Sequence, residues 1–163
     1  MSSIVTESLL EAAFRNYIYG MIGIAVVLFI HGSCLFRIIA FFERHEQSYQ
    51  ESKRHNLLFF NFYLCFVLIA GVHILEITAW GIALYVSGLI DTYPHALLFA
   101  GSCYTTIGFL GDILPPTWQG LAFFISFSGL FTLAWTTSSM VGMMAANQKA
   151  WKLKYAHRLA RKK

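Results

Sequence analysis

Three long apolar segments separated by polar stretches dominate the pattern of the chain. They cover about residues 17–42, 57–90 and 118–145. A membrane-spanning helix needs about 20 mostly apolar residues, so each segment can cross a bilayer once and none can cross it twice. The most polar stretch, 43–56, lies between the first two segments and reads as a loop. The pattern predicts an all-α membrane protein with three transmembrane helices.

A shorter element is predicted between the second and third segments. Pro94 suits the first turn of a helix, with Asp91 or Thr92 as its cap. Residues 95–104 then supply about ten helical positions, too few to span a bilayer. Short apolar helices followed by glycine-containing backbone occur at membrane depth only where protein covers them or water reaches them. We therefore expect a re-entrant helix and loop.

Composition and charge support the membrane class. The chain is 57% hydrophobic and 12% charged, against about 25% charged residues in typical soluble domains. No Lys or Arg occurs between His55 and Gln148. The net charge of +4 is concentrated at one end, with seven of the twelve basic residues in the last fifteen. Such a short tail does not form the folded basic face that nucleic-acid binding requires, so we expect no nucleic-acid partner.

The distribution of basic residues also predicts the orientation. Cytoplasmic segments of membrane proteins carry an excess of Lys and Arg, which places the 43–56 loop and the C-terminal tail in the cytoplasm. The N-terminus and residues 91–117 then lie outside the plasma (inner) membrane. Trp151, Tyr155 and Leu159 recur at helical spacing among the tail's basic residues. The tail either lies on anionic lipid or continues the last helix, or is simply solvated.

One short motif carries a direct chemical meaning. Residues 105–112 read Thr-Thr-Ile-Gly-Phe-Leu-Gly-Asp. This stretch resembles the potassium-channel selectivity filter, Thr-Thr-(Val/Ile)-Gly-(Tyr/Phe)-Gly-Asp, with Leu110 added between the aromatic residue and the second glycine. The resemblance extends to the order of elements, because a span and a short helix precede the motif and another span follows it.

The surrounding residues narrow the resemblance to small bacterial potassium-channel-like proteins of the two-pore-domain type of ion channel. In those proteins, as here, a His-x-x-Glu and Trp segment precedes the filter, and a helix rich in Trp, Ser and Thr follows it. The matching positions are His73 to Glu76 with Trp80, and Ala134 to Thr137. The resemblance covers about residues 57–145, and neither the first span nor the tail is included.

The resemblance implies a function and a mechanism. In potassium channels, backbone carbonyls of the filter replace the hydration shell of the ion. The ion-binding positions here would be Thr105, Thr106, Ile107, Gly108, Phe109, Leu110, Gly111 and Asp112. One chain carries one copy of the motif, so four identical chains would surround the pore. The expected protein is a homotetrameric, passive potassium channel without enzymatic activity, and with no cofactor besides the permeating K⁺.

Leu110 is the main departure from the family pattern. If it occupies the second glycine position, a residue with a Cβ must adopt a strained backbone conformation, at a cost of about 1 kcal/mol or more. If it is an insertion, Gly111 keeps the glycine role and the chain bulges at Leu110. The inner positions, Thr106 to Gly108, survive in both cases. The alternative to a potassium channel is therefore a non-selective cation channel.

The last apolar segment carries a polar face. Four hydroxyl residues fall on one side of a helix and predict either a water-lined cavity wall or hydrogen bonds between helices. Gly129 lies about twenty residues beyond Phe109, where channels of this type place a gating hinge, and a packing role is equally compatible. The predicted pore-lining or gating residues are Ser128, Gly129, Thr132, Thr136 and Ser139.

His73 and Glu76 lie one helical turn apart inside the second span. Ionisable residues in a membrane span are costly and default to a functional hypothesis. We expect them to support the filter from behind, with His31 or the Asp112 region as further partners. A different class remains open, a membrane redox or haem protein that uses His31, His73, Glu76 and His95. A non-conducting membrane scaffold is a third reading.

The expected organisation has three parts. Residues 1–56 form an additional transmembrane helix and a cytoplasmic loop. Residues 57–145 form the pore module of outer helix, pore helix, filter and inner helix. Residues 146–163 form the basic cytoplasmic tail.

Overall fold

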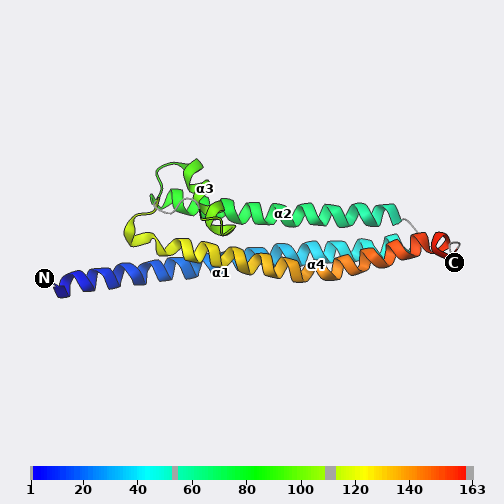
Figure 1. Ribbon diagram of the computed structural model, residues 1–163, viewed down its shortest axis with the longest axis horizontal. Helices are drawn as coiled ribbons and strands as arrows, with labels where there is room; N and C mark the ends of the chain where they lie inside the picture. Colours follow the sequence, from blue (N-terminus) through cyan, green and yellow to red (C-terminus); the bar gives the residue numbers. More distant parts are fainter. Residues whose placement is uncertain (1, 53–54, 109–112, 161–163) are drawn as a thin grey trace. The chain divides into compact units, whose positions relative to one another are not determined.

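Helices account for every regular element in the described part of the chain. The computed structural model describes residues 2–52, 55–108 and 113–160. In chain order the elements are α1 (Ser2–Glu51), α2 (His55–Val86), α3 (Tyr93–Tyr104), the 3₁₀ turn η1 (Pro116–Trp118) and α4 (Gly120–Ala160) (Figure 1). The prediction of an all-α chain with a short helix between its second and third spans is confirmed at this level.

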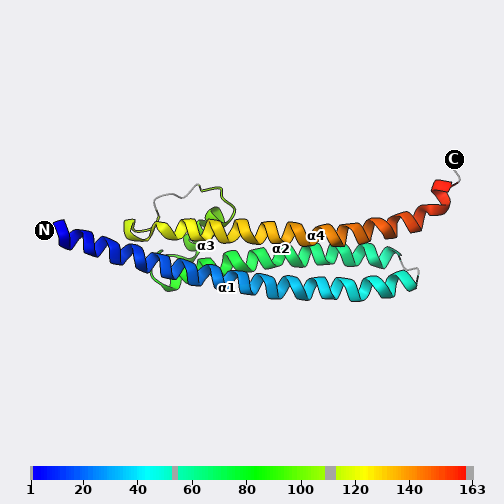
Figure 2. The ribbon, with the colours of Figure 1, turned by 90° about the horizontal axis from the view of Figure 1, so that it is seen from below.

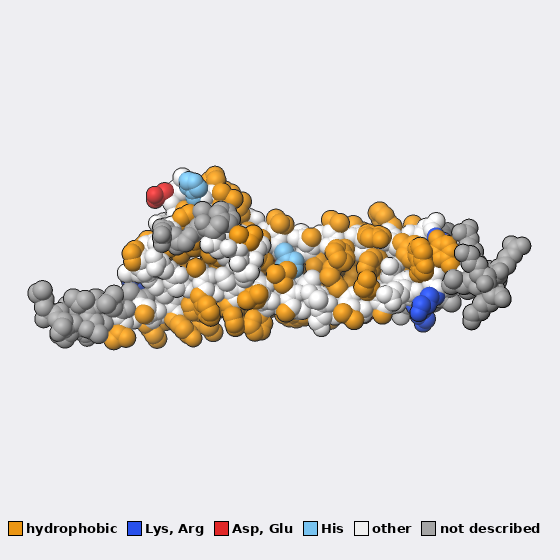
Figure 3. Space-filling view, in the orientation of Figure 1, with side chains coloured by type: hydrophobic (Ala, Val, Ile, Leu, Met, Phe, Trp, Pro, Cys, Tyr) orange, Lys and Arg blue, Asp and Glu red, His pale blue; other side chains and the backbone are white. Residues whose placement is uncertain are grey.

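Three of these helices are long and apolar enough to cross a membrane. The candidate spans are Ala13–Tyr49, Asn56–Val86 and Pro116–Lys149. Large hydrophobic side chains such as Phe29, Phe36 and Val86 are about three-quarters exposed, and hydrophobic side chains are spread over the face shown in Figure 3. Exposed apolar surface on this scale is expected where lipid or partner chains cover a protein. The chain is a membrane-embedded protein.

The polar stretch between the first two spans is not the loop that the sequence predicts. Helix α1 continues through Glu43 and Arg44 to Glu51, and α2 begins at His55, so only residues 52–54 connect the helices. Glu, Arg and Gln are strong helix formers. Their polarity therefore marks the end of the apolar span without ending the helix. In the same way α4 continues into the basic tail as far as Ala160.

Helix α2 ends four residues before the predicted boundary at Ile90. Gly88 has a φ of 69° and terminates the helix in a Schellman motif. Its N–H donates to the carbonyl of Tyr85, and the N–H of Leu89 donates to the carbonyl of Leu84. Glycine adopts this left-handed conformation without the steric cost that a Cβ brings, so Gly88 ends the helix although the apolar pattern continues.

The start of α3 agrees with the sequence. Thr92 is the N-cap residue and Pro94 lies in the first turn, where its missing N–H costs no hydrogen bond. The Thr92 hydroxyl pairs with Nδ1 of His95 at 2.9 Å, and the Thr92 carbonyl accepts from the N–H of Ala96 at 3.0 Å. The cap and the proline are as predicted, and the helix begins at Tyr93, two residues before the predicted range of 95–104.

The chain divides into two compact units. The first comprises Met1–His31 and His73–Leu133, so it holds all of α3 and parts of the three long helices. Figure 1 and Figure 2 show α3 beside the C-terminal part of α2. Their shared core includes the buried side chains of Trp80, Phe99 and Ile125. This core fixes α3, and hence the start of the Thr105–Gly108 segment, against α2 and α4.

The second unit comprises Gly32–Val72 and Ala134–Lys163. Its core is built from α1, α2 and α4, with Leu35, Phe42, Cys65 and Met143 buried. The Asn61 side-chain amide donates to the carbonyl of Phe42 at 3.4 Å, which satisfies a buried polar group. Its buried side chains are mostly apolar, whereas the ionisable side chains of His31 and Glu76 are buried in the first unit.

Candidate functional site

The segment after α3 turns back onto the end of that helix. The N–H of Thr105 still donates to the carbonyl of Gly101 at 3.0 Å, and the N–H of Gly108 returns to the carbonyl of Ser102 at 3.1 Å. The Thr105 hydroxyl adds a second bond to Gly101 at 2.7 Å. These bonds hold residues 105–108 close to the C-terminal turn of α3, and all four residues are exposed.

Positive and non-positive φ angles alternate along the backbone of this segment. Thr106 has a φ of 61° and Gly108 a φ of 66°, whereas Ile107 between them does not have a positive φ. Thr106 is the single non-glycine residue with positive φ in the described chain. For a residue with a branched Cβ this conformation costs about 1 kcal/mol or more. Strained backbone of this kind clusters at functional sites of proteins.

Glu76 of α2 forms the centre of a buried polar cluster. Its carboxylate is fully buried, and Oε1 lies 2.8 Å from Nδ1 of His31 on α1, which is also fully buried. Oε2 accepts a hydrogen bond from the hydroxyl of Tyr104 and lies 3.7 Å from Nδ1 of His73. A buried carboxylate is stable only when paired and hydrogen-bonded, and these three partners provide that.

Tyr104, the last residue of α3, connects the cluster to α4. Its hydroxyl lies 2.7 Å from Nδ1 of His73 and 2.6 Å from the hydroxyl of Thr132. Because Tyr104 donates its one proton to Glu76, it accepts from His73 in this arrangement. The cluster therefore ties the end of α3 to α1, α2 and α4. We call His31, His73, Glu76, Tyr104 and Thr132 the buried polar cluster.

The structure brings together part of the histidine set considered from the sequence. His31, His73 and Glu76 meet in the buried polar cluster, so His31 is a partner of Glu76. His95 does not join them, because it is exposed at the start of α3 beside Thr92. Asp112, the other partner considered for Glu76, lies outside the described residues.

The hydroxyl residues predicted to line a pore have different environments. Ser128 and Thr132 are fully buried and hydrogen-bonded inside the first unit, Ser128 to the Trp80 indole N–H at 3.1 Å. This arrangement favours hydrogen bonding between helices, the alternative to a water-lined wall, at these two positions. Thr136 is 6% exposed and Ser139 partly exposed, and both belong to the second unit.

Gly129 of α4 lies against the backbone of Tyr104. A Cβ at this position would overlap the Tyr104 carbonyl oxygen and would lie 2.9 Å from its carbonyl carbon. Only glycine permits so close an approach of two backbones. Helix α4 runs without interruption through this position. The contact supports the packing role for Gly129.

Tyr104 is the functional candidate that the sequence reasoning missed. It directly precedes the filter-like motif, which was a usable signal, but its aromatic ring fitted the apolar pattern of α3. Thr132 was recognised as a polar position on α4 and not as a partner of Tyr104. In each of these two contacts, Tyr104 meets a residue 28 positions away in the sequence, on another helix. The periodicity within one helix does not encode contacts between helices.

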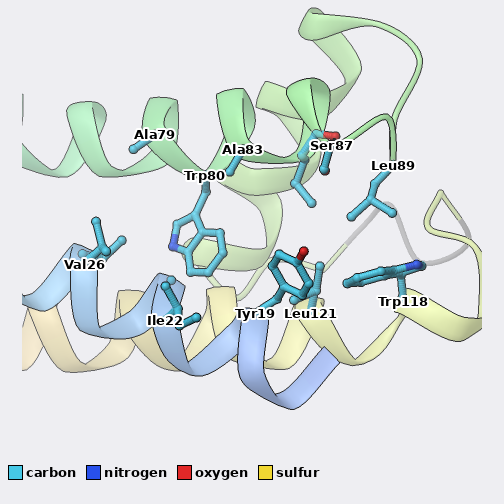
Figure 4. A pocket seen from close by; sticks show the side chains of 13 residues that line it. Tyr19, Ile22, Val26, Ala79, Trp80, Ala83, Ser87, Leu89, Trp118 and Leu121 are labelled. Atoms are coloured by element: carbon cyan, nitrogen blue, oxygen red, sulfur yellow. Dashed lines mark hydrogen bonds between the residues drawn. The ribbon is translucent and has the colours of Figure 1, made fainter. Parts of the chain in front are cut away.

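The first unit also has an apolar cavity of about 540 Å³. Figure 4 shows side chains of α1, α2 and the start of α4 around it. They include Tyr19, Trp80 and Trp118, and the Arg15 guanidinium lies over the Trp118 ring, 5.6 Å from its centre. No charged side chain is among the described residues that line this cavity, and no residue of the buried polar cluster lines it.

The outer half of the filter-like motif, Phe109, Leu110, Gly111 and Asp112, lies outside the described residues. Comparison of the chain with protein-family models, curated proteins and solved structures finds no match. The motif, the three spans and the geometry of the first unit are therefore the features that indicate a function.

Proposed function

We propose that this chain is the subunit of a passive cation channel with potassium as the permeating ion. In this proposal it resembles the small bacterial potassium-channel-like proteins. Backbone carbonyls of residues 106–109 and the Thr106 hydroxyl coordinate the ion, and Leu110 and Gly111 continue the filter outward. Asp112 shapes the outer mouth. Transport is passive, with no enzymatic step and no cofactor required for conduction.

The observation that carries the proposal is the backbone of Thr105–Gly108. The segment is exposed, it follows the C-terminus of a short helix, and its φ angles are positive at Thr106 and Gly108. In a regular strand successive carbonyls point to opposite sides, and in a helix they point along the helix axis. A backbone whose φ angles alternate in sign can instead direct successive carbonyls toward one axis. The partial negative charge at the end of α3 also favours a nearby cation.

The buried polar cluster supports this proposal from behind the segment. Tyr104 immediately precedes Thr105, and its hydroxyl bonds Glu76 and Thr132. A conformation as strained as that of Thr106 persists only where its surroundings determine it. The contacts of Tyr104 fix the position of the chain on the α3 side of Thr106. In this role His73 and Glu76 support the filter and do not contact the ion.

The assembly and orientation belong to the same proposal. Four chains are required to form a ring from one filter copy per chain, which makes α3 and residues 105–112 a re-entrant element of a homotetramer. The N-terminus lies outside the plasma membrane and the basic tail lies in the cytoplasm, where it can contact anionic lipids. Ser139 and Thr136 are the remaining hydroxyl candidates for lining the inner part of the pore.

Vesicle flux tests the proposal. Purified chain is reconstituted into liposomes loaded with K⁺, and efflux is compared with that of protein-free liposomes. The proposal predicts cation efflux that scales with protein and a particle mass in detergent of four chains. Absence of efflux at all voltages and pH values would exclude a channel. A visible Soret band in the purified protein would instead favour the redox class.

A further inference from the structure

We propose that His31, His73 and Glu76 form a binding site for a divalent transition-metal ion of the Zn²⁺ type. Each residue offers one ligating atom, and these atoms lie within 4.8 Å of one another. This site goes beyond ion conduction, and it also departs from the expectation that the chain binds only permeating ions. It requires neither a pore nor a tetramer, since all three residues belong to the first unit of a single chain.

The donor set identifies the class of metal. Two imidazole nitrogens and one carboxylate oxygen form a recurrent ligand set for Zn²⁺ and for Fe²⁺. Mg²⁺ and Ca²⁺ prefer sites composed of oxygen ligands, so His31 and His73 select against them. The phenol oxygen of Tyr104 lies 2.7 Å from Nδ1 of His73 and can serve as a fourth, oxygen ligand.

The geometry is close to that of a metal centre. Ligands about 2.1 Å from a tetrahedral zinc ion lie about 3.4 Å from one another. Nδ1 of His31 is 2.8 Å from one Glu76 oxygen, and Nδ1 of His73 is 3.7 Å from the other. The first pair would separate by about half an ångström on metal binding, and the second pair already has nearly this spacing. All three ligating atoms lie within 4.8 Å of one another, so the rearrangement is within the range of side-chain rotation.

Charge and hydrogen bonds are compatible with exchange of protons for the metal. Metal ligands must be deprotonated, so binding releases protons. For Nδ1 to ligate the ion, His31 and His73 would each carry the ring proton on Nε2, and Tyr104 would release the proton that it donates to Glu76. One proton is then released, and the Glu76 carboxylate and the Tyr104 phenolate would balance the two positive charges of the ion. The His73 side chain is 14% exposed, which gives an entry path.

Co²⁺ is the probe for this site, because its visible absorption reports the number and type of ligands. Full-length protein in detergent, without a polyhistidine tag, is titrated with Co²⁺ and then with Zn²⁺. We expect one Co²⁺ per chain and a visible absorption spectrum typical of Co²⁺ with four ligands. Addition of Zn²⁺ should abolish that spectrum. Absence of saturable Co²⁺ binding at one ion per chain would overturn the proposal.

Substitutions assign the binding to these residues. His31→Gln and His73→Gln keep a hydrogen-bond donor but remove a good metal ligand, and each is expected to weaken Co²⁺ binding at least tenfold. His95→Ala is the matched control, because this histidine is exposed and away from the cluster, and it should bind like wild type. Unchanged affinity in both glutamine variants would overturn the proposal. If His31→Gln fails to fold, the partly exposed His73 position decides.

Discussion

The hydroxyl of Tyr104, at the end of α3, donates a hydrogen bond to the buried carboxylate of Glu76 on α2. This bond links the residue directly before the filter-like segment to a fully buried acidic group of the first unit. His73 and Thr132 complete the hydrogen bonds of the same phenol. The ordered end of α3 thus depends on polar contacts as well as on the apolar core.

Tyr104→Phe is expected to destabilise the protein by about 1–3 kcal/mol. The change keeps the ring and removes the hydroxyl, so Glu76 and its neighbours lose a buried partner. Chemical unfolding in detergent measures the cost, and a double-mutant cycle with Glu76→Gln should give a coupling of about 0.5–3 kcal/mol. Tyr85→Phe is the control, because Tyr85 is 46% exposed. Equal stability of Tyr104→Phe and wild type would show that the bond contributes nothing.

Gly129→Ala is expected to cost about 1–3 kcal/mol or more. The added methyl group would overlap the Tyr104 carbonyl, and overpacking against backbone cannot be relieved by a side-chain rotation. Gly142→Ala on the same helix is the control, since no atom lies within 4 Å of its added Cβ. The control should be neutral or slightly stabilising. A hinge role for Gly129 predicts instead a change in channel opening with little loss of stability.

Gly108→Ala should reduce cation flux by more than its effect on stability explains. Gly108 and Gly88 have φ angles of 66° and 69°, and among the described residues no atom lies within 4 Å of a Cβ added to either. Alanine at either site should therefore cost a similar amount, about 1 kcal/mol. Only Gly108 belongs to the proposed ion path. Equal flux in the two variants would argue against a role for this backbone in conduction.

Deletion of Leu110 should increase the preference for K⁺ over Na⁺. The deletion restores the spacing of the potassium-channel filter and so the expected number of carbonyl sites. Competitive flux of the two ions in liposomes measures the preference, with wild type as the reference. Unchanged selectivity would show that Leu110 does not limit it.

The apolar pattern predicted the helices well because burial in lipid requires long uncharged segments. It located their ends poorly. The chain continues as helix through Glu43 to Glu51, where polarity changes but helix propensity does not, and α2 stops at Gly88 although apolar residues follow. The local backbone preference of one glycine outweighed the pattern of its neighbours.

The candidate site was predicted in part. Glu76 and His73 were recognised because ionisable residues inside a span are costly, and His31 was considered as a partner for the same reason. Tyr104 and Thr132 fitted other patterns, and their pairing depends on the packing of α3 between α2 and α4. Contacts between distant helices are set by side-chain packing, which the spacing within one helix does not report.

Ionic current through reconstituted protein tests the central claim most directly. The wild-type chain is incorporated into a planar bilayer with a K⁺ gradient, and the reversal potential is recorded before and after Na⁺ replaces K⁺ on one side. We predict unitary currents that reverse toward the K⁺ equilibrium potential. Equal currents for K⁺ and Na⁺ would contradict selectivity alone. Absence of current at every voltage, or a reversal potential set by the anion, would contradict the cation channel.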